Sequence, residues 1–169
     1  MGETRCASMP QPPENANAAT ILARLIDSIG FRLHWATEGL RAEDQDFCPG
    51  EGCMSTRELL KHIHGLVMRV DAAFGSDATV VEHKSFETLC AATLQTTNAL
   101  ARRVAANSDE EIAAAQLVRD DGKVISVWHL INGPLADALT HIGQINSWRR
   151  LAGNPTRKVN LLFGIPPET

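Results

Sequence analysis

The chain has 169 residues, 44% of them hydrophobic and 21% charged, which is the composition of a globular domain large enough for one core. Aromatic residues make up only 5% and tyrosine is absent, so helices are favoured over a β-sandwich. The formal net charge is −4 and the basic residues are scattered. This excludes the basic stripe of nucleic-acid-binding proteins and gives no attraction to an anionic membrane.

The N-terminal residues and the cysteines together predict a cytoplasmic protein. No segment comes near the roughly 18 apolar residues that a membrane span requires, and the N-terminus lacks the apolar core of a secretory signal. The four cysteines form no CxxC pair, so we expect reduced thiols. Residues 1–14 are polar and rich in proline, which predicts a disordered or loosely packed tail before a domain at residues 15–169.

The first two predicted helices are amphipathic. Between about residues 15 and 39, apolar side chains recur every three or four positions, as on one face of a helix. Residues 41–54 are first charged and then rich in Pro and Gly, which predicts a loop. Ser55 and Glu58 have the spacing of a capping box, so a second helix is expected to begin there and to end near Phe74.

A third helix is expected from about Ser85 to Ala106, on the same periodicity. Residues 109–127 differ, because two β-rich runs flank the turn sequence Asp120-Asp121-Gly122. That pattern is typical of a hairpin.

The last helix, expected between Asn132 and Pro155, has the most complete boundary signals. Pro134 suits a first helical turn because it has no N–H to leave unpaired. Gly153 and Pro155 end the helix. The segment is apolar around most of its circumference, so we expect it to be buried. Four long helices of this kind predict an all-α four-helix bundle, with a small β-hairpin insert before the last long helix.

A polar line runs along the last helix. Asp137, His141 and Gln144 share one face at spacings of four and three residues, and a carboxylate buried beside an imidazole needs a partner. A capping carboxylate with a core histidine is the competing interpretation, because D-x3-H arises often by chance. His62 from the second helix supplies a third donor. His62, Asp137 and His141 are therefore predicted to be metal ligands that leave an open position, as in catalytic sites.

Two imidazoles and one carboxylate suit zinc, nickel or ferrous iron. Gln144 is expected to bind a ligand side chain or the water at the open position. His64 lies roughly 160° from His62 around the helix, so only one of the two can point to the site. His34, near the end of the first helix, is expected to be packed or solvated.

Two segments resemble the DinB-like (YfiT-type) superfamily of four-helix bundles. They are STRELLKHIHG at residues 55–65 and PLADALTHIGQINSWRRLAGNP at residues 134–155. In that family three histidines typically hold a divalent metal ion, one on the second helix and two, four residues apart, on the fourth. The resemblance places His62 and His141 at two of these positions and Asp137 at the third, so this chain carries a carboxylate where the family has a histidine.

The resemblance implies a metal-dependent enzyme acting on a small molecule. Family members with assigned activity look like thiol-dependent transferases or isomerases that use a low-molecular-weight thiol, and a hydrolase is also compatible with such a site. A non-catalytic metal-binding or stress-related bundle is the competing hypothesis, and the loss of metal binding through Asp137 is a third. Because homodimers are common among such bundles, a homodimer is expected. No general base is assigned.

Overall fold

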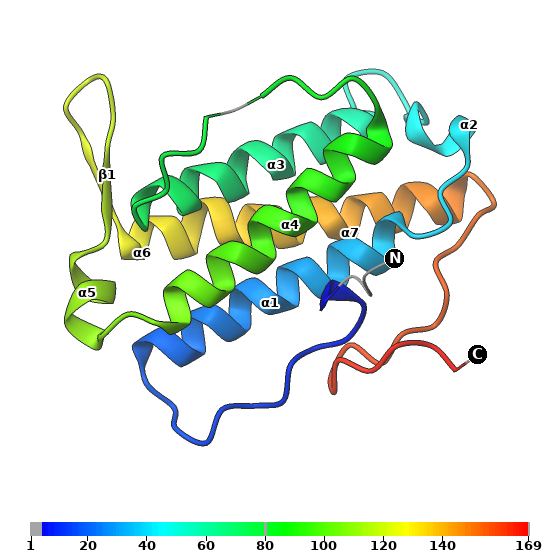
Figure 1. Cartoon of the computed structure of the whole chain (residues 1–169). Helices are drawn as coiled ribbons and strands as arrows, with labels where there is room; N and C mark the ends of the chain where they lie inside the picture. Colours follow the sequence, from blue (N-terminus) through cyan, green and yellow to red (C-terminus); the bar gives the residue numbers. More distant parts are fainter. Residues whose placement is uncertain (1–4, 80, 169) are drawn as a thin grey trace.

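The computed structural model describes residues 5–79 and 81–168, and most of them belong to helices (Figure 1). Four long helices form the body of the molecule: α1 (Ala18–Thr37), α3 (Thr56–Ala73), α4 (Phe86–Ala105) and α7 (Ala136–Leu151). The first three begin with capping boxes at Asn17, Ser55 and Ser85, which satisfy N–H groups of the first turn. The predicted box between Ser55 and Glu58 is among them.

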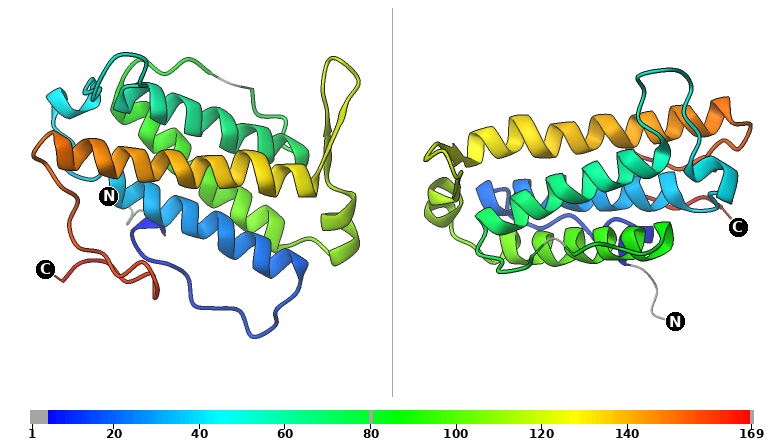
Figure 2. Two further views of the ribbon diagram at one scale, coloured as in Figure 1. Left: turned by 180° about the vertical axis from the view of Figure 1, so that it is seen from behind. Right: turned by 90° about the horizontal axis from the view of Figure 1, so that it is seen from above.

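The long helices form a ring in which α1 packs on α4, α4 on α3, α3 on α7 and α7 on α1 (Figure 2). α1 and α4 are antiparallel, because the Cys90 thiol donates to Thr37 near the end of α1, while Ala18 at its start donates to Asp109 beyond α4. α3 and α4 run in the same direction, and the chain therefore returns along the bundle between them. The four-helix bundle that the sequence predicted is confirmed.

The core fills the centre of the ring with aliphatic side chains from all four helices. Its largest fully buried members are Phe31, Ile26, Ile29, Leu33, Leu59, Leu60, Ile63, Leu100, Leu130, Leu135, Ile142 and Ile145. Burial of this apolar surface is the main favourable term in folding. Two polar links reinforce the parallel α3–α4 pair, one from Arg103 to the buried Asp71 and one between Thr93 Oγ1 and His64 Nδ1 at 3.1 Å.

The insert before the last helix contains the predicted hairpin and one helix that was not predicted. β1 (Gln116–Val118) pairs antiparallel with β2 (Val124–Ser126), and Gly122 has a φ of 77° in the turn between them. The hairpin is confirmed. It is preceded by α5 (Asp109–Ala114), whose N-terminus carries a capping box between Ser108 and Glu111.

Pro134 does not begin the last helix, but the sequence also indicated an earlier helical turn at residues 128–131 that leads into it, and such a turn is present. Helical structure starts at α6 (Val127–Leu130), passes through the π-helical turn η2 (Ile131–Leu135) and continues as α7. The N–H of Ala136 donates to the carbonyl of Ile131, five residues earlier. The wider turn accommodates Pro134, which has no N–H for a regular helical bond and whose ring would clash in one.

The prediction that the last helix is buried around most of its circumference is also wrong. α7 packs against α3 and α1 through one apolar stripe, including Ala138, Ile142 and Ile145. Leu151, expected in the core, is 65% exposed.

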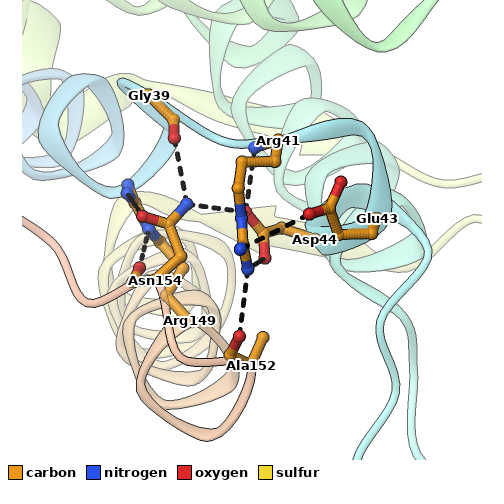
Figure 3. A network of polar contacts seen from close by, with 7 residues as sticks. All are labelled: Gly39, Arg41, Glu43, Asp44, Arg149, Ala152 and Asn154. Atoms are coloured by element: carbon orange, nitrogen blue, oxygen red, sulfur yellow. Dashed lines mark hydrogen bonds and ion pairs between the residues drawn. The ribbon is translucent and has the colours of Figure 1, made fainter.

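The loop between α1 and α3 is tied to the end of α7 by a polar network (Figure 3). The loop contains a short helix, α2 (Ala42–Gln45), and within it Asp44 is buried. Asp44 accepts from both Nε and Nη2 of Arg41, at 3.0 and 2.7 Å, and from Nδ2 of Asn154 at 2.6 Å. Arg149, also buried, donates to the carbonyls of Ala36 and Glu38. The network closes one end of the bundle.

The described part of the predicted tail, residues 5–14, lies against the bundle. A short 3₁₀ turn, η1 (Arg5–Ala7), places the buried Cys6 in the core. The Trp35 indole donates to the carbonyl of Ala7 at 2.9 Å, and Arg24 donates to the carbonyl of Pro10. The remainder of the expected tail, residues 1–4, lies outside the described residues. No helix within residues 5–79 and 81–168 combines the length and apolar character needed to cross a bilayer.

Candidate metal centre

The three predicted ligands meet where α3 packs against α7. His62 comes from α3, and Asp137 and His141 come from consecutive turns of α7. His62 Nε2 lies 3.2 Å from Asp137 Oδ2, and His141 Nε2 lies 3.2 Å from Asp137 Oδ1. One donor atom from each of the three side chains can be chosen so that the three lie within 4.8 Å of one another. The structure therefore brings together the set that the sequence singled out.

The antiparallel packing of α3 and α7 produces this meeting point. Trp148, near the end of α7, donates from its indole N–H to the carbonyl of Met54 just before α3 begins, at 2.9 Å. Going backward along α7 and forward along α3 from that bond brings Asp137 and His141 level with His62. Trp148, which continues the polar line in the sequence, thus fixes the register of the two helices.

Gln144 holds the ring of His141. Its Oε1 lies 2.7 Å from Nδ1 of His141, one turn away on the same face of α7. Because a carbonyl oxygen can only accept, Nδ1 carries the proton, and in the neutral ring the lone pair is on Nε2. Nε2 is the atom that faces Asp137. The predicted role of Gln144 as a partner of a ligand side chain agrees with this geometry.

The site is buried on one side and open on the other. The His141 side chain is 11% exposed, whereas those of His62 and Asp137 are 43% and 44% exposed. The sequence-based expectation that Asp137 is buried is wrong, because α7 lies on the surface of the ring and only one of its stripes faces the core. Solvent thus reaches the donor atoms from outside the bundle.

Two glycines that sequence reasoning missed lie one turn from the ligands. Gly65 follows His62 on α3 and Gly133 precedes Asp137 on the last helix. A Cβ added at either position would meet no atom within 4 Å, so both border open space. A glycine inside a helix lowers helix stability by about 1 kcal/mol relative to alanine. The presence of two such glycines near the predicted ligands was the only feature of the sequence that could have indicated open space there.

Asp137 does not cap a helix, and among the described residues it forms no salt bridge with Arg or Lys. The helix continues upstream of it through η2 and α6, so it does not lie at a free helix start. Within the described part of the chain, the only groups in salt-bridge range of Asp137 are the two imidazoles. The capping role that the sequence left open for Asp137 therefore lacks support, whereas the buried His141 does make the hydrogen bond expected of a core histidine, to Gln144.

The donor set fits a divalent cation. When both imidazoles are neutral and His62, like His141, carries its proton on Nδ1, three lone pairs converge, and a cation is the group that satisfies all three. Each imidazole Nε2 lies 3.2 Å from a different oxygen of the Asp137 carboxylate, so His62, Asp137 and His141 are the side chains that would hold the ion. Zinc, nickel and ferrous iron all accept this set.

The other two histidines considered from the sequence lie elsewhere. His64 is buried between α3 and α4, where Thr93 contacts its Nδ1 and the ring of His83 lies 5.1 Å away. Burial, and secondarily the nearby His83, lower the pKa of His64, so it is a neutral packing residue. His34 packs edge-on against Trp35. The prediction that only one of His62 and His64 points to the site is confirmed.

No protein-family model matches the sequence, and no curated protein matches it significantly. Among solved structures, the chain is similar to YfiT from Bacillus subtilis, which is described as a probable metal-dependent hydrolase with an unusual four-helix bundle topology. The TM-score is 0.58 at 13% sequence identity, and the match covers 88% of this chain and 98% of that chain. This chain therefore has the YfiT-type four-helix-bundle fold that the sequence resemblance predicted.

Proposed function

We propose that this protein is a divalent-metal-dependent hydrolase of a small molecule. The observation that carries the proposal is the meeting of His62, Asp137 and His141 at a point that is open to solvent on one side. Three protein ligands with room for a further group are the arrangement of a catalytic metal site. The similarity to YfiT, itself described as a probable metal-dependent hydrolase, supports the same reaction class.

Each residue has a distinct task in this proposal. A divalent ion held by the three ligands supplies a Lewis acid and makes water nucleophilic at neutral pH. Gln144 holds the His141 ring so that Nε2 faces the site. Asp137 contributes the single negative charge among the ligands, which lowers the net charge of the loaded site relative to three imidazoles. Gly65 and Gly133 leave space for a substrate beside it.

The exposure of the ligands favours a catalytic over a structural role. A structural metal site is closed by its protein ligands, whereas nearly half of the Asp137 side chain is exposed here. The thiol-dependent transferase or isomerase predicted from the resemblance uses the same three ligands. Like the homodimer and the cytoplasmic location, it stays a prediction.

Metal analysis of protein purified without a histidine tag tests the first half of the proposal. After supplementation with zinc, nickel or ferrous iron, we expect about one ion per chain in the wild type and less than about 0.1 in the His62→Ala/His141→Ala double variant. His129→Ala is the matched control, because this exposed histidine lies outside the site and is expected to leave the stoichiometry unchanged. A wild-type protein that stays metal-free would overturn the proposal.

An esterase assay with p-nitrophenyl acetate tests the second half. The loaded wild type and His129→Ala are expected to exceed the rate of the same concentration of free metal. The double variant is expected to lose at least about 100-fold of this excess. Equal rates for the wild type and the double variant would contradict a hydrolytic role of the site, even if the ion binds.

A further inference from the structure

A groove of about 640 Å³ lies between α1, α7 and the C-terminal segment. α1 contributes Arg32 and Trp35 to its lining, α7 contributes Ile142 and Arg150, and residues 156–159 form part of the third wall. None of the three predicted metal ligands lines it. The groove is therefore separate from the metal centre.

The groove and the metal centre use opposite faces of α7. Asp137 and His141 lie on the face toward His62 of α3. Ile142, Asn146 and Arg150 line the groove. At about 100° per residue, these three lie on average roughly 160° around the helix axis from the ligand pair. A ligand in the groove would not contact the metal centre.

Four cationic side chains line the groove: Arg32, Arg150, Arg157 and Lys158. The chain as a whole is acidic, with 20 Asp and Glu residues and 16 Lys and Arg residues. The described residues that line the groove nevertheless include four of these cations and no Asp or Glu. None of the four is in a salt bridge within residues 5–79 and 81–168. In the part of the chain that the structure describes, no carboxylate therefore lies close enough to pair with their positive charge.

The hydrogen bonds that two of these cations make go to neutral oxygens. Arg32 Nε donates to the Ser28 hydroxyl at 3.2 Å, and Arg157 Nη2 donates to the main-chain carbonyl of Glu168 at 3.1 Å. Neither bond neutralises the guanidinium. Like charges gathered in one concave region repel one another and create a positive potential that attracts anions. Arginine forks match the oxygens of phosphate and carboxylate groups.

The floor of the groove is apolar and its walls are held in place. The partly buried Leu25 and Leu139 contribute aliphatic surface beside the Trp35 ring. The hydrogen bond from the Trp35 indole to Ala7 holds that ring. A cationic rim over an apolar floor is complementary to a molecule with a charged head and an apolar body.

The third wall is anchored to the rest of the molecule. Asn160 and Ile165 exchange two backbone hydrogen bonds, which close a short loop at the end of the wall. Met9 donates its N–H to the carbonyl of Gly164 in that loop, at 3.0 Å. The groove thus exists before a ligand binds, which lowers the entropic cost of binding.

We propose that this groove binds a small organic anion that carries a phosphate or carboxylate head and an apolar body. Arg32 and Arg150, which line the groove from α1 and α7, bind the head together with Arg157 or Lys158. The apolar body lies on Leu25, Leu139 and the Trp35 ring. The site is independent of the metal centre and of the hydrolase proposed for it.

Titration calorimetry with n-octyl phosphate, below its micellar concentration, tests the proposal on the full chain. We expect saturable binding of one molecule per chain, at least about 10-fold weaker binding of inorganic phosphate, and no saturable binding of n-octanol. Arg32→Ala and Arg150→Ala are each expected to weaken octyl phosphate binding at least about 5-fold, and Arg150→Lys less, since it keeps the charge but not the fork.

Two matched variants separate binding in the groove from binding at the metal centre and from general attraction of anions to surface arginines. Arg69→Ala removes an exposed arginine on α3 and is expected to leave binding within about 2-fold, as is His62→Ala, which removes a metal ligand. Loss of binding in His62→Ala would overturn the proposal, because the phosphate would then occupy the metal centre. So would unchanged binding in the Arg32→Ala/Arg150→Ala double variant, equal binding of inorganic phosphate, or binding of the chain only to anionic phospholipid vesicles.

Discussion

Two polar clusters are built from similar parts and have opposite character. At the end of the bundle, Asp44 is buried and accepts from Arg41 and Asn154, so its charge is fully compensated (Figure 3). In the middle of the α3–α7 contact, Asp137 is nearly half exposed and faces only two imidazoles among the described residues. The first cluster is complete within the protein. The second has no Arg or Lys paired with its carboxylate among the described residues, as expected of a site that takes its cation from solution.

The largest effect is expected from substituting Asp137. Asp137→Ala removes one of three ligands and is expected to lower metal affinity more than about 100-fold. Losing a residue that only hydrogen-bonds to a ligand typically lowers the affinity by about 10- to 100-fold. Asp137→His introduces the histidine that the superfamily resembled by this sequence typically has at the position, and is expected to keep affinity within about 10-fold of the wild type. Competition with a chromophoric chelator measures both. Full affinity in Asp137→Ala would show that the carboxylate is not a ligand.

The corresponding substitution in the Asp44 cluster is expected to lower the stability of the fold and to leave metal binding unchanged. Asp44→Ala leaves Arg41 and Asn154 without their buried acceptor and is expected to lower the free energy of unfolding by about 3 kcal/mol. Urea unfolding measures this, with Asp137→Ala as the matched control in metal-free protein. If Asp137→Ala were the more destabilising of the two, the contrast between the clusters would be wrong.

Substituting Gln144 tests whether its hydrogen bond orients the His141 ring before a metal ion binds. Gln144→Ala frees the His141 ring and is expected to lower metal affinity about 10- to 100-fold without changing stoichiometry at saturation. Gln144→Glu keeps an acceptor at the same position and is expected to lose less. The same chelator competition serves here. A Gln144→Ala variant with wild-type affinity would show that packing alone orients the ring.

The smallest expected effect is a pH dependence of stability due to Asp44. Hydrogen bonds from Arg41, together with the one from Asn154, hold the pKa of Asp44 well below its usual range. A depressed pKa in the folded state gives stability that is present above the unfolded pKa of about 4 and is lost as the pH falls below it. The urea midpoint of the wild type should therefore fall more steeply below about pH 4 than that of Asp44→Asn.

Much of the fold could be predicted because it depends on local signals. Capping at Ser55, helical periodicity and the Asp-Gly turn indicated three long helices and the hairpin. The same local logic failed at Pro134, because packing on α3 keeps the helix continuous and a π-helical turn absorbs the proline. α5 was missed although Ser108 and Glu111 carry a capping signal, since the β-rich residues after it dominated the interpretation.

The candidate site could be predicted in its members but not in its environment. The spacing of Asp137 and His141 on one helix face is a property of the sequence, and so is the position of His62 on a second, capped helix, to which the resemblance added support. The exposure of Asp137 depends on how far α7 lies from the centre of the ring, which long-range packing decides. The basic groove depends on the backbone bond between Met9 and Gly164, which joins residues from the two ends of the chain and has no local signal.

The direction of α3 has a consequence for folding. His62 and Asp137 are 75 residues apart in sequence, and they become neighbours only when the last helix has docked antiparallel to α3. An unfolded chain offers an ion at most the adjacent Asp137–His141 pair. Added metal should therefore bind the assembled ring preferentially and raise its unfolding temperature, with about 2.7 kcal/mol of stabilisation at a free ion concentration of about 100 times Kd. A drop in the unfolding temperature when a chelator removes the metal would then measure the docking of the last helix onto α3, and not the stability of a single helix.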